Sequence, residues 1–176
     1  MKIIRLTTPL KESDVKKLRV GDLVTISGKI ATARDKVYAR VINGEKLPID
    51  IRGGVIYHCG PLAQRTVGKW RIISAGPTTS ARMDPMQAEF VKRTGVRGLV
   101  GKGGVGEDVA RNLAKLGCVY LAYTGGAGAL AANQVEEVEK VFWEELGPEA
   151  IWVLRVEDFG PLVVAVDTVC GNLYLR

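Results

Sequence analysis

The sequence predicts an α/β domain with a mainly parallel sheet and glycine-rich loops between strands and helices. From about residue 68, short apolar runs with strand character alternate with runs of helical spacing. That alternation is typical of βα units with right-handed crossovers. Three glycine-rich segments fall at the strand-to-helix junctions, and no low-complexity linker interrupts the 176 residues. We therefore predict one domain over residues 1–176.

The first sixty residues are expected to be mostly β and to add a second sheet layer. Residues 20–31 alternate apolar and polar side chains, which predicts a half-buried strand. Residues 37–42 and 47–51 are predicted to be two further strands, joined by a tight turn at Asn43–Glu45. A short helix over residues 13–18 is expected, capped by Ser13.

The remaining residues predict alternating elements. Strands are expected at 70–75, 96–100 and 118–123, and helices at 84–93, 107–116 and 127–133. The strongly charged segment 135–146 is predicted to be a helix that Gly147-Pro148 stops. Two closing strands are expected at 153–156 and 162–166, with a turn at residues 159–161 between them.

Composition narrows the class of protein. Apolar residues make up 47% of the chain, yet no apolar run is long enough to span a bilayer. The start, Met1–Arg5, becomes charged too early for a signal peptide, so we expect a cytoplasmic protein. The net charge is +6, but the basic residues are spread out, and a nucleic-acid partner is not expected. A small anionic substrate or an acidic protein partner explains the charge better.

The three cysteines, Cys59, Cys118 and Cys170, lie far apart and form no CxxC pair. No zinc site or complete iron–sulfur site is therefore predicted in this chain. His58 is the sole histidine, and no G-x-S-x-G motif accompanies it. We interpret His58 as structural or solvated rather than as the carrier of a proton.

Three glycine-rich corners predict an anion site. They are Gly76–Thr79, Gly101–Gly106 and Thr124–Gly128, and Arg82 and Lys102 add positive charge. In a parallel sheet such corners share the carboxyl edge, where ligands bind. Glycine lets the backbone approach a ligand, and helix starts present free amides. The alternative is that these glycines only form tight turns.

The second corner matches G-x-G-x-x-G, which is found in dinucleotide-binding proteins. The next strand, however, ends in Tyr123-Thr124-Gly125 rather than near an acid for the ribose, and no P-loop motif is present. Lys102 is better suited to a carboxylate or phosphate oxygen. Ala33-Arg34-Asp35 is either an exposed charged turn or a grip for a carboxylate.

Taken together, four pieces of the chain resemble the β subunit, or C-terminal domain, of class I iron–sulfur fumarases and L-tartrate dehydratases. The resemblance covers nearly the whole sequence. The pieces are Ser27-Gly28 through Ala33-Arg34-Asp35, Leu47-Pro48-Ile49-Asp50 through Tyr57–Pro61, Gly76-Pro77-Thr78-Thr79 with Arg82-Met83-Asp84, and Gly101-Lys102-Gly103 and Tyr120-Leu121 with Gly125-Gly126.

The resemblance implies a swivelling β/β/α three-layer domain. It also implies a larger α subunit that carries a [4Fe–4S] cluster, with no cluster ligand in this chain. The implied reaction is reversible hydration of a C4 dicarboxylate, expected here as fumarate to (S)-malate, with L-tartrate dehydration as the alternative. A non-catalytic anion-binding regulatory module is a further alternative.

The resemblance also implies roles for individual residues. Thr78 corresponds to the proposed base, although the residues alone would suggest a helix-capping hydroxyl. Tyr38 stands where the family often has histidine. The implied catalytic residues are Thr78, Arg82 and Lys102, and the implied substrate-binding residues are Arg34, Thr79, Gly125 and Gly126.

Overall fold

The structure, a computed structural model, describes residues 3–175. Its strands are β1 (Ile3–Thr7), β2 (Leu23–Thr32), β3 (Val55–Tyr57), β4 (Leu62–Thr66), β5 (Lys69–Ser74), β6 (Gly98–Gly101), β7 (Val119–Ala122), β8 (Val135–Phe142) and β9 (Ile151–Val166). Its helices are α1 (Glu12–Val15), α2 (Asp35–Ile42), α3 (Asp84–Thr94), α4 (Glu107–Lys115) and α5 (Gly128–Asn133), with 3-10 turns η1 (Ser80–Met83) and η2 (Glu144–Glu149).

Seven strands form one sheet in the order β1-β2-β3-β6-β7-β9-β8. The first five of these run parallel to one another, while β9 is antiparallel to both β7 and β8. The long strand β9 also pairs with β2. The prediction of a mixed α/β fold with a mostly parallel sheet is confirmed, whereas its swivelling character stays a prediction.

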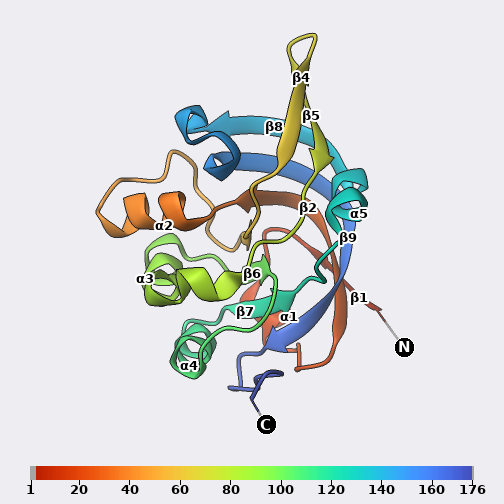
Figure 1. The fold of residues 1–176 in the computed structure, drawn as a ribbon. Helices are drawn as coiled ribbons and strands as arrows, with labels where there is room; N and C mark the ends of the chain where they lie inside the picture. Colours follow the sequence, from red (N-terminus) through yellow and green to blue (C-terminus); the bar gives the residue numbers. More distant parts are fainter. Residues whose placement is uncertain (1–2, 176) are drawn as a thin grey trace.

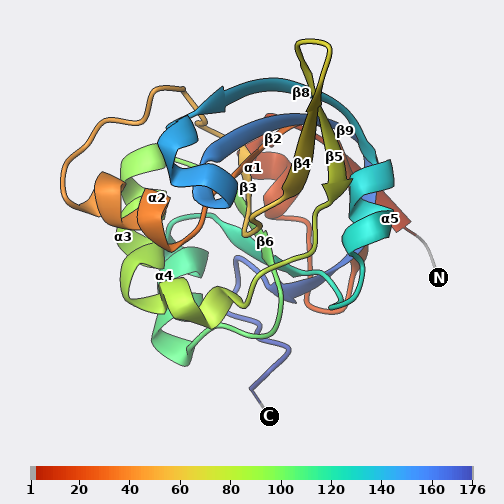
Figure 2. The ribbon, with the colours of Figure 1, turned by 45° about the horizontal axis from the view of Figure 1, so that its top comes forward.

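Helices α2, α3 and α4 lie side by side on one face of the sheet, and β2, β8 and β9 curve round the other side (Figures 1 and 2). Apolar side chains fill both spaces. One core lies among the strands and includes Val24, Leu121 and Phe159. The other lies under the helices and includes Phe90 and Leu113. Burial on both faces explains why β6 and β7 consist of apolar runs without alternation.

The prediction of strands at 37–42 and 47–51 is wrong. Residues 35–42 form helix α2, whose buried residues Val37, Tyr38 and Val41 follow helical spacing. The apparent alternation of Val37, Ala39 and Val41 misled the strand assignment. Residues 47–51 contain no strand, so the turn at Asn43 and Gly44 ends a helix instead of joining a hairpin.

The segment 135–146 is also not the predicted helix, because residues 135–142 form strand β8. Its valines, Val135, Val138 and Val141, recur every three residues and all pack against the core among the strands. Two register shifts against β9, one between each pair of valines, keep these side chains on one face of a strand. The two bulges therefore give this strand a three-residue apolar spacing that resembles the spacing of a helix.

Three smaller predictions also need correction. The two closing strands are one 16-residue strand, β9. Helix α1 begins after Lys11, whose amide donates to the Asp14 carboxylate, so Ser13 is not its cap. Strand β5 pairs only with β4, in an antiparallel hairpin outside the parallel sheet.

Within residues 3–175, no helix has the length and apolar character needed to cross a membrane.

Candidate functional site

Four parallel strands, β2, β3, β6 and β7, end at the same edge of the sheet. Arg34 follows β2, His58 follows β3, Lys102 follows β6 and Gly125 follows β7. This is the edge at which open α/β sheets bind ligands. The predicted placement of the second and third glycine corners at one edge of the sheet is confirmed, and Arg34 lies at the same edge.

The Gly76–Thr79 loop reaches this edge by a route that the sequence did not predict. Although β5 lies outside the sheet, the loop inserts between the ends of β3 and β6. The amide of Thr78 donates to the His58 carbonyl (2.7 Å), and the Lys102 amide donates to the Thr78 carbonyl (3.1 Å). The Ser80 amide then donates to the Lys102 carbonyl (3.1 Å). Thr78 and Lys102 are thus fixed side by side through their backbones.

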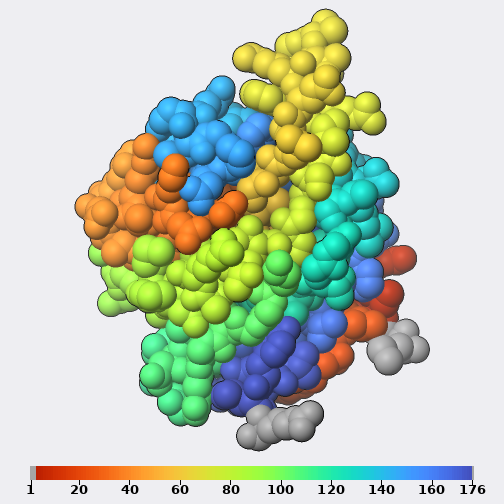
Figure 3. Space-filling model, viewed as in Figure 1, coloured from red at the N-terminus to blue at the C-terminus, as the bar shows by residue number. Residues whose placement is uncertain are grey.

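Lys102 lies against the third corner. A Cβ added to Gly125 would stand 3.3 Å from Cδ of Lys102, so glycine leaves room for the lysine stem there. Gly126, at φ +80°, has open space around it. The third corner is joined to the first because the Ala75 amide donates to the Gly128 carbonyl (3.0 Å). The space-filling view shows the yellow-green 76–83 segment and the teal 124–130 segment on one face (Figure 3).

Arg82 lies in η1, directly after the Thr78–Ser80 segment, and is exposed. Lys102 is exposed as well. Among residues 3–175, neither side chain forms an ion pair with a carboxylate. No hydrogen bond or ion pair within that range joins Arg82 to the other predicted site residues. Two positive charges at this edge are therefore available to an anion.

Arg34 lies at the border of the site. Its Nη1 atom lies 2.9 Å from the place that a Cβ on Gly60 would occupy, and the neighbouring Cys59 pairs with Pro77. Its Nε atom lies 3.5 Å from Oε1 of Glu149, close enough for an ion pair, but that buried Nε makes no hydrogen bond. A second carboxylate, that of Asp35, lies 3.8 Å from its Nη2 atom. The exposed-turn interpretation is wrong for Arg34, because its side chain is only 23% exposed.

The two threonine hydroxyls carry no capping bond. Thr79 occupies the cap position of η1 but makes no side-chain hydrogen bond there. Within residues 3–175, the hydroxyl of Thr78 has no hydrogen-bond partner either. The capping interpretation of Thr78 is thus not supported, and its hydroxyl is free for a ligand.

Helix starts contribute less than predicted. Helices α3 and α4 carry acidic side chains in their own first turns. The Gly106 amide, at the start of α4, donates to Oδ2 of Asp84 (2.8 Å), whose pKa is raised by burial. Only α5, with no acidic residue in its first turn, resembles the predicted free helix start. Positive side chains rather than helix ends give this edge its charge.

Beneath the site runs a chain of buried polar groups that sequence reasoning missed. Tyr38 Oη lies 2.7 Å from His58 Nε2, and His58 Nδ1 lies 2.7 Å from Ser80 Oγ. Tyr120 Oη lies 3.0 Å from that Oγ and 2.8 Å from the Gly103 carbonyl oxygen. No local sequence signal marks this set, because Tyr38 and Tyr120 lie in predicted strands, His58 is interpreted on its own, and Ser80 is given no role.

His58 is fully buried, which confirms its interpretation as a structural histidine. Burial lowers the pKa of its imidazole to about 3, because the charged form would lose its hydration there. Tyr38 is equally buried and stacks on Phe90. It therefore supports His58 and does not reach the surface of the site.

The cysteines do not fit an iron–sulfur cluster. Cys59 and Cys118 are buried, and burial raises the pKa of the Cys59 thiol to about 12 and that of Cys118 further still. Metal ligation needs the thiolate. Across the described part of the chain, no group of three or more His, Cys, Asp and Glu side chains gathers into a metal site.

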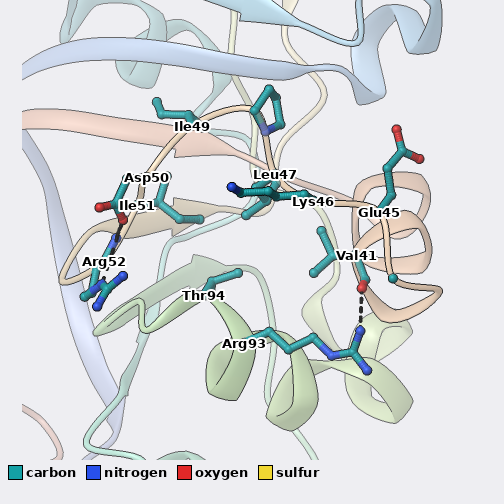
Figure 4. A pocket seen from close by; sticks show the side chains of 12 residues that line it. Val41, Glu45, Lys46, Leu47, Ile49, Asp50, Ile51, Arg52, Arg93 and Thr94 are labelled. Carbon is teal, nitrogen blue, oxygen red and sulfur yellow. Dashed lines mark hydrogen bonds and ion pairs between the residues drawn. The ribbon is translucent and has the colours of Figure 1, made fainter.

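A hollow of about 590 Å³ lies away from this edge, between the 44–52 loop and the end of α3 (Figure 4). Arg93 borders it and donates to the carbonyl of Val41 (2.8 Å). None of the predicted site residues lines this hollow. The predicted site lies instead at the exposed edge of the sheet, where Arg82 and Lys102 are exposed.

Comparison with known proteins identifies the family. The family model described as "Fumarase C-terminus" matches residues 1–176. The chain belongs to the fumarase C-terminus family. The resemblance predicted from the four sequence pieces is thereby confirmed.

Members of this family that are similar to the chain include subunits of hydro-lyases. The L(+)-tartrate dehydratase subunit beta of Escherichia coli is 44% identical over 170 residues, covering 96% of this chain and 85% of the relative. A putative L(+)-tartrate dehydratase subunit beta of Methanocaldococcus jannaschii is 46% identical over 171 residues, covering 94% and 88%. A putative class I fumarate hydratase of Geobacillus stearothermophilus is 41% identical over 175 residues, covering 98% of this chain but 34% of the relative.

These relatives support the coarse prediction of a hydro-lyase β subunit. They do not confirm fumarate as the substrate, which was the main prediction. Of the relatives above, both that match this chain over most of their own length are named for tartrate dehydratase. The alternative prediction is thus the better supported of the two.

The buried histidine predicts a pH dependence of stability. Because the folded pKa of His58, about 3, lies below the ordinary 6.5, the unfolded chain binds the proton first as pH falls. The His58 contribution is therefore complete above pH 6.5 and is lost as pH falls toward 3. Between pH 7 and pH 5 we expect a loss of about 2 kcal/mol in the free energy of unfolding.

Urea denaturation of the native chain and of His58→Gln at both pH values measures this loss. Carboxylates titrate in both proteins, so the difference between their pH dependences isolates the histidine. Equal pH dependence in the two proteins would contradict the expectation.

Proposed function

We propose that this chain is the β subunit of a two-subunit hydro-lyase that acts on a C4 dicarboxylate, with L-tartrate as the first candidate substrate and fumarate as the second. The observation that carries the proposal is the fixed pairing of Thr78 with Lys102 beside the unpaired Arg82. The names of the relatives favour tartrate. Residues 1–176 are proposed to act as one swivelling domain, and a cytoplasmic location stays a prediction.

The chemistry follows from the charges. A C4 dicarboxylate has two negative groups. Lys102 and Arg82 offer positive charges that have no acidic partner within residues 3–175, and Arg34 lies at the border. Removal of a proton next to a carboxylate builds negative charge on that carboxylate, which these cations stabilise. Thr78 is the proposed base, since its hydroxyl is free and Lys102 lies beside it. The same cations favour the alkoxide that this role requires.

The open shape of the site supports a larger partner. Lys102, Arg82, Gly125 and Gly126 are all exposed, so this edge alone cannot exclude water from a substrate. In the Geobacillus relative, this chain corresponds to about a third of a longer protein. The remainder of such a protein is equivalent, in our proposal, to the separate α subunit. Any [4Fe–4S] cluster is assigned to that subunit, because the cysteines here do not fit one.

The β4–β5 hairpin supports the same partner. It projects from the body of the molecule (Figures 1 and 3) and begins and ends next to two site loops. Its tip, Val67, is 98% exposed. Its exposed basic residues include Arg65, Lys69 and Arg71, and neither its two strands nor its turn contains an acidic residue. An isolated two-stranded hairpin is marginally stable in water. An acidic surface of the α subunit would complement it.

Anaerobic assays of the chain co-produced with the larger subunit test the proposal. We expect dehydration of L-tartrate by the complex, a slower or absent hydration of fumarate, and no turnover by either subunit alone. Faster fumarate hydration would select the second candidate. Tight dicarboxylate binding by this chain alone, without turnover in the complex, would instead support a non-catalytic binding module.

A further inference from the structure

We propose that Tyr38, His58, Ser80 and Tyr120 form a one-directional hydrogen-bond chain that positions the Gly101–Gly103 loop, and Lys102 with it. All four side chains are fully buried. They come from α2, the end of β3, η1 and β7, so the hydrogen-bond chain links a helix, a 3-10 turn and two strands of the sheet. The positioning role rests on the proposed function, whereas the hydrogen-bond direction does not.

The protons available match the bonds that need them. Four hydrogen bonds join Tyr38, His58, Ser80, Tyr120 and the Gly103 carbonyl in series. Three hydroxyls and one N–H of a neutral imidazole supply four protons. Every bond can therefore be made, provided that each group donates once.

The last acceptor sets the direction. A carbonyl oxygen can only accept, so the phenol of Tyr120 donates to Gly103 and must accept from Ser80. Ser80 has then used its proton and accepts from Nδ1–H of His58. Nε2 of His58 is left without a proton and accepts from the Tyr38 hydroxyl. The structure thus assigns the Nδ1–H tautomer to His58.

The opposite direction fails at both ends. If Tyr120 donated to Ser80, the Gly103 carbonyl would lose its donor. Nε2–H of His58 would then point at Tyr38, whose own proton would have no acceptor in a fully buried place. The Tyr38 hydroxyl would then be an unpaired buried donor, which costs about 1–3 kcal/mol, and the part-buried Gly103 carbonyl would lose its protein donor as well.

The hydrogen-bond chain connects three parts of the site: Arg34, Lys102 and Gly103. Tyr38 lies one turn after Arg34 in α2, and its amide donates to the Arg34 carbonyl (3.0 Å). Ser80 holds the Lys102 carbonyl through its amide (3.1 Å). Tyr120 holds the next carbonyl, that of Gly103, at 2.8 Å. Lys102 is therefore held on both sides, so that its side chain starts from a fixed backbone.

Because His58 is the sole histidine, nitrogen NMR of the full chain labelled with ¹⁵N-histidine reads the tautomer directly. We expect a neutral ring protonated at Nδ1 only. Tyr120→Phe removes the hydroxyl that links Ser80 to the Gly103 carbonyl. The hydrogen bonds among Tyr38, His58 and Ser80 then leave one hydroxyl proton unpaired in whichever direction they run. We therefore expect a mixture of both tautomers. A native ring protonated at Nε2 would overturn the assignment. An Nδ1–H ring that is unchanged in Tyr120→Phe would overturn the claim that the Gly103 carbonyl sets the direction.

Kinetics of the assembled enzyme test the positioning role. Tyr38→Phe keeps the ring stacked on Phe90 but removes the hydroxyl. We expect kcat for the better substrate to fall about tenfold with KM changed less than about twofold. Tyr123→Phe is the control, because its hydroxyl donates to Gln134 Oε1 (3.1 Å), outside the chain.

Equal kcat losses in Tyr38→Phe and Tyr123→Phe would contradict the positioning role, because any buried tyrosine hydroxyl would then matter as much as those in the hydrogen-bond chain. If the native complex turns over neither tartrate nor fumarate, the proposed function fails instead. The NMR result stands apart from that failure, since it needs no activity.

Discussion

Lys102→Ala is expected to lower kcat of the assembled hydro-lyase by about 10²–10³-fold while leaving the chain folded and able to assemble. The lysine is exposed and has no acidic partner within residues 3–175, so its removal breaks no protein ion pair. Its backbone bonds to Thr78 and Ser80 do not involve the side chain and remain. The loss should therefore appear in catalysis and not in stability.

Steady-state kinetics and thermal unfolding of the same preparations measure both quantities. Lys115→Ala is the matched control, because it removes one exposed positive charge from the end of α4, away from the site. Arg82→Ala is expected to behave like Lys102→Ala. If Lys102→Ala unfolds at a clearly lower temperature than the control, the lysine is structural. If it retains full kcat, the proposed site is wrong.

Prediction from sequence succeeded where a single period was strong and local. Helix α4 shows its buried Ala110, Leu113 and Ala114 at helical spacing, and α3 begins with Asp84-Pro85 and ends before Gly95 at φ +68°. The apolar runs of β6, between these helices, and of β7, after α4, then require a buried parallel sheet. From these elements alone, the shared edge that carries Lys102 and Gly125 follows.

Prediction failed where tertiary contacts changed the period. Register shifts in β8 gave its valines a helical spacing, and only the partner strand β9 shows why. The pairing of β5 with β4 is similarly invisible, because the apolar run of β5 suits a sheet strand equally well. The Thr78 loop still reached the site, since backbone hydrogen bonds to the ends of β3 and β6 replaced the predicted strand.

The site residues themselves came from motif resemblance, and their roles remain predictions. The support beneath them did not come from any motif. Tyr38, His58, Ser80 and Tyr120 are scattered over more than eighty residues of the sequence and touch only in the folded chain. No local sequence pattern marks such a set, because its members are related by matching hydrogen-bond donors to acceptors and not by regular spacing along the sequence.

Gly101→Ala is expected to be the most damaging single change to stability among the site glycines. A Cβ at this position would lie 1.8 Å from Oγ of Ser80 and 2.9 Å from Nδ1 of His58. Both neighbours are fully buried and cannot swing into solvent. Relief requires a backbone shift, a broken His58–Ser80 hydrogen bond, or both.

We expect the free energy of unfolding to fall by about 3 kcal/mol or more, as overpacking and a lost buried hydrogen bond combine. Gly76→Ala is the control, because a Cβ there would meet only backbone atoms of Gly128, at ordinary distances of 3.7 and 4.0 Å. The double variant Gly101→Ala with Ser80→Ala removes the closest clash and should recover part of the stability lost by Gly101→Ala. A single variant as stable as Gly76→Ala would mean that Gly101 does not pack against this buried chain. Because the hydroxyl responsible for the clash also holds the histidine in place, full recovery in the double variant would show that the hydrogen bond adds nothing to stability.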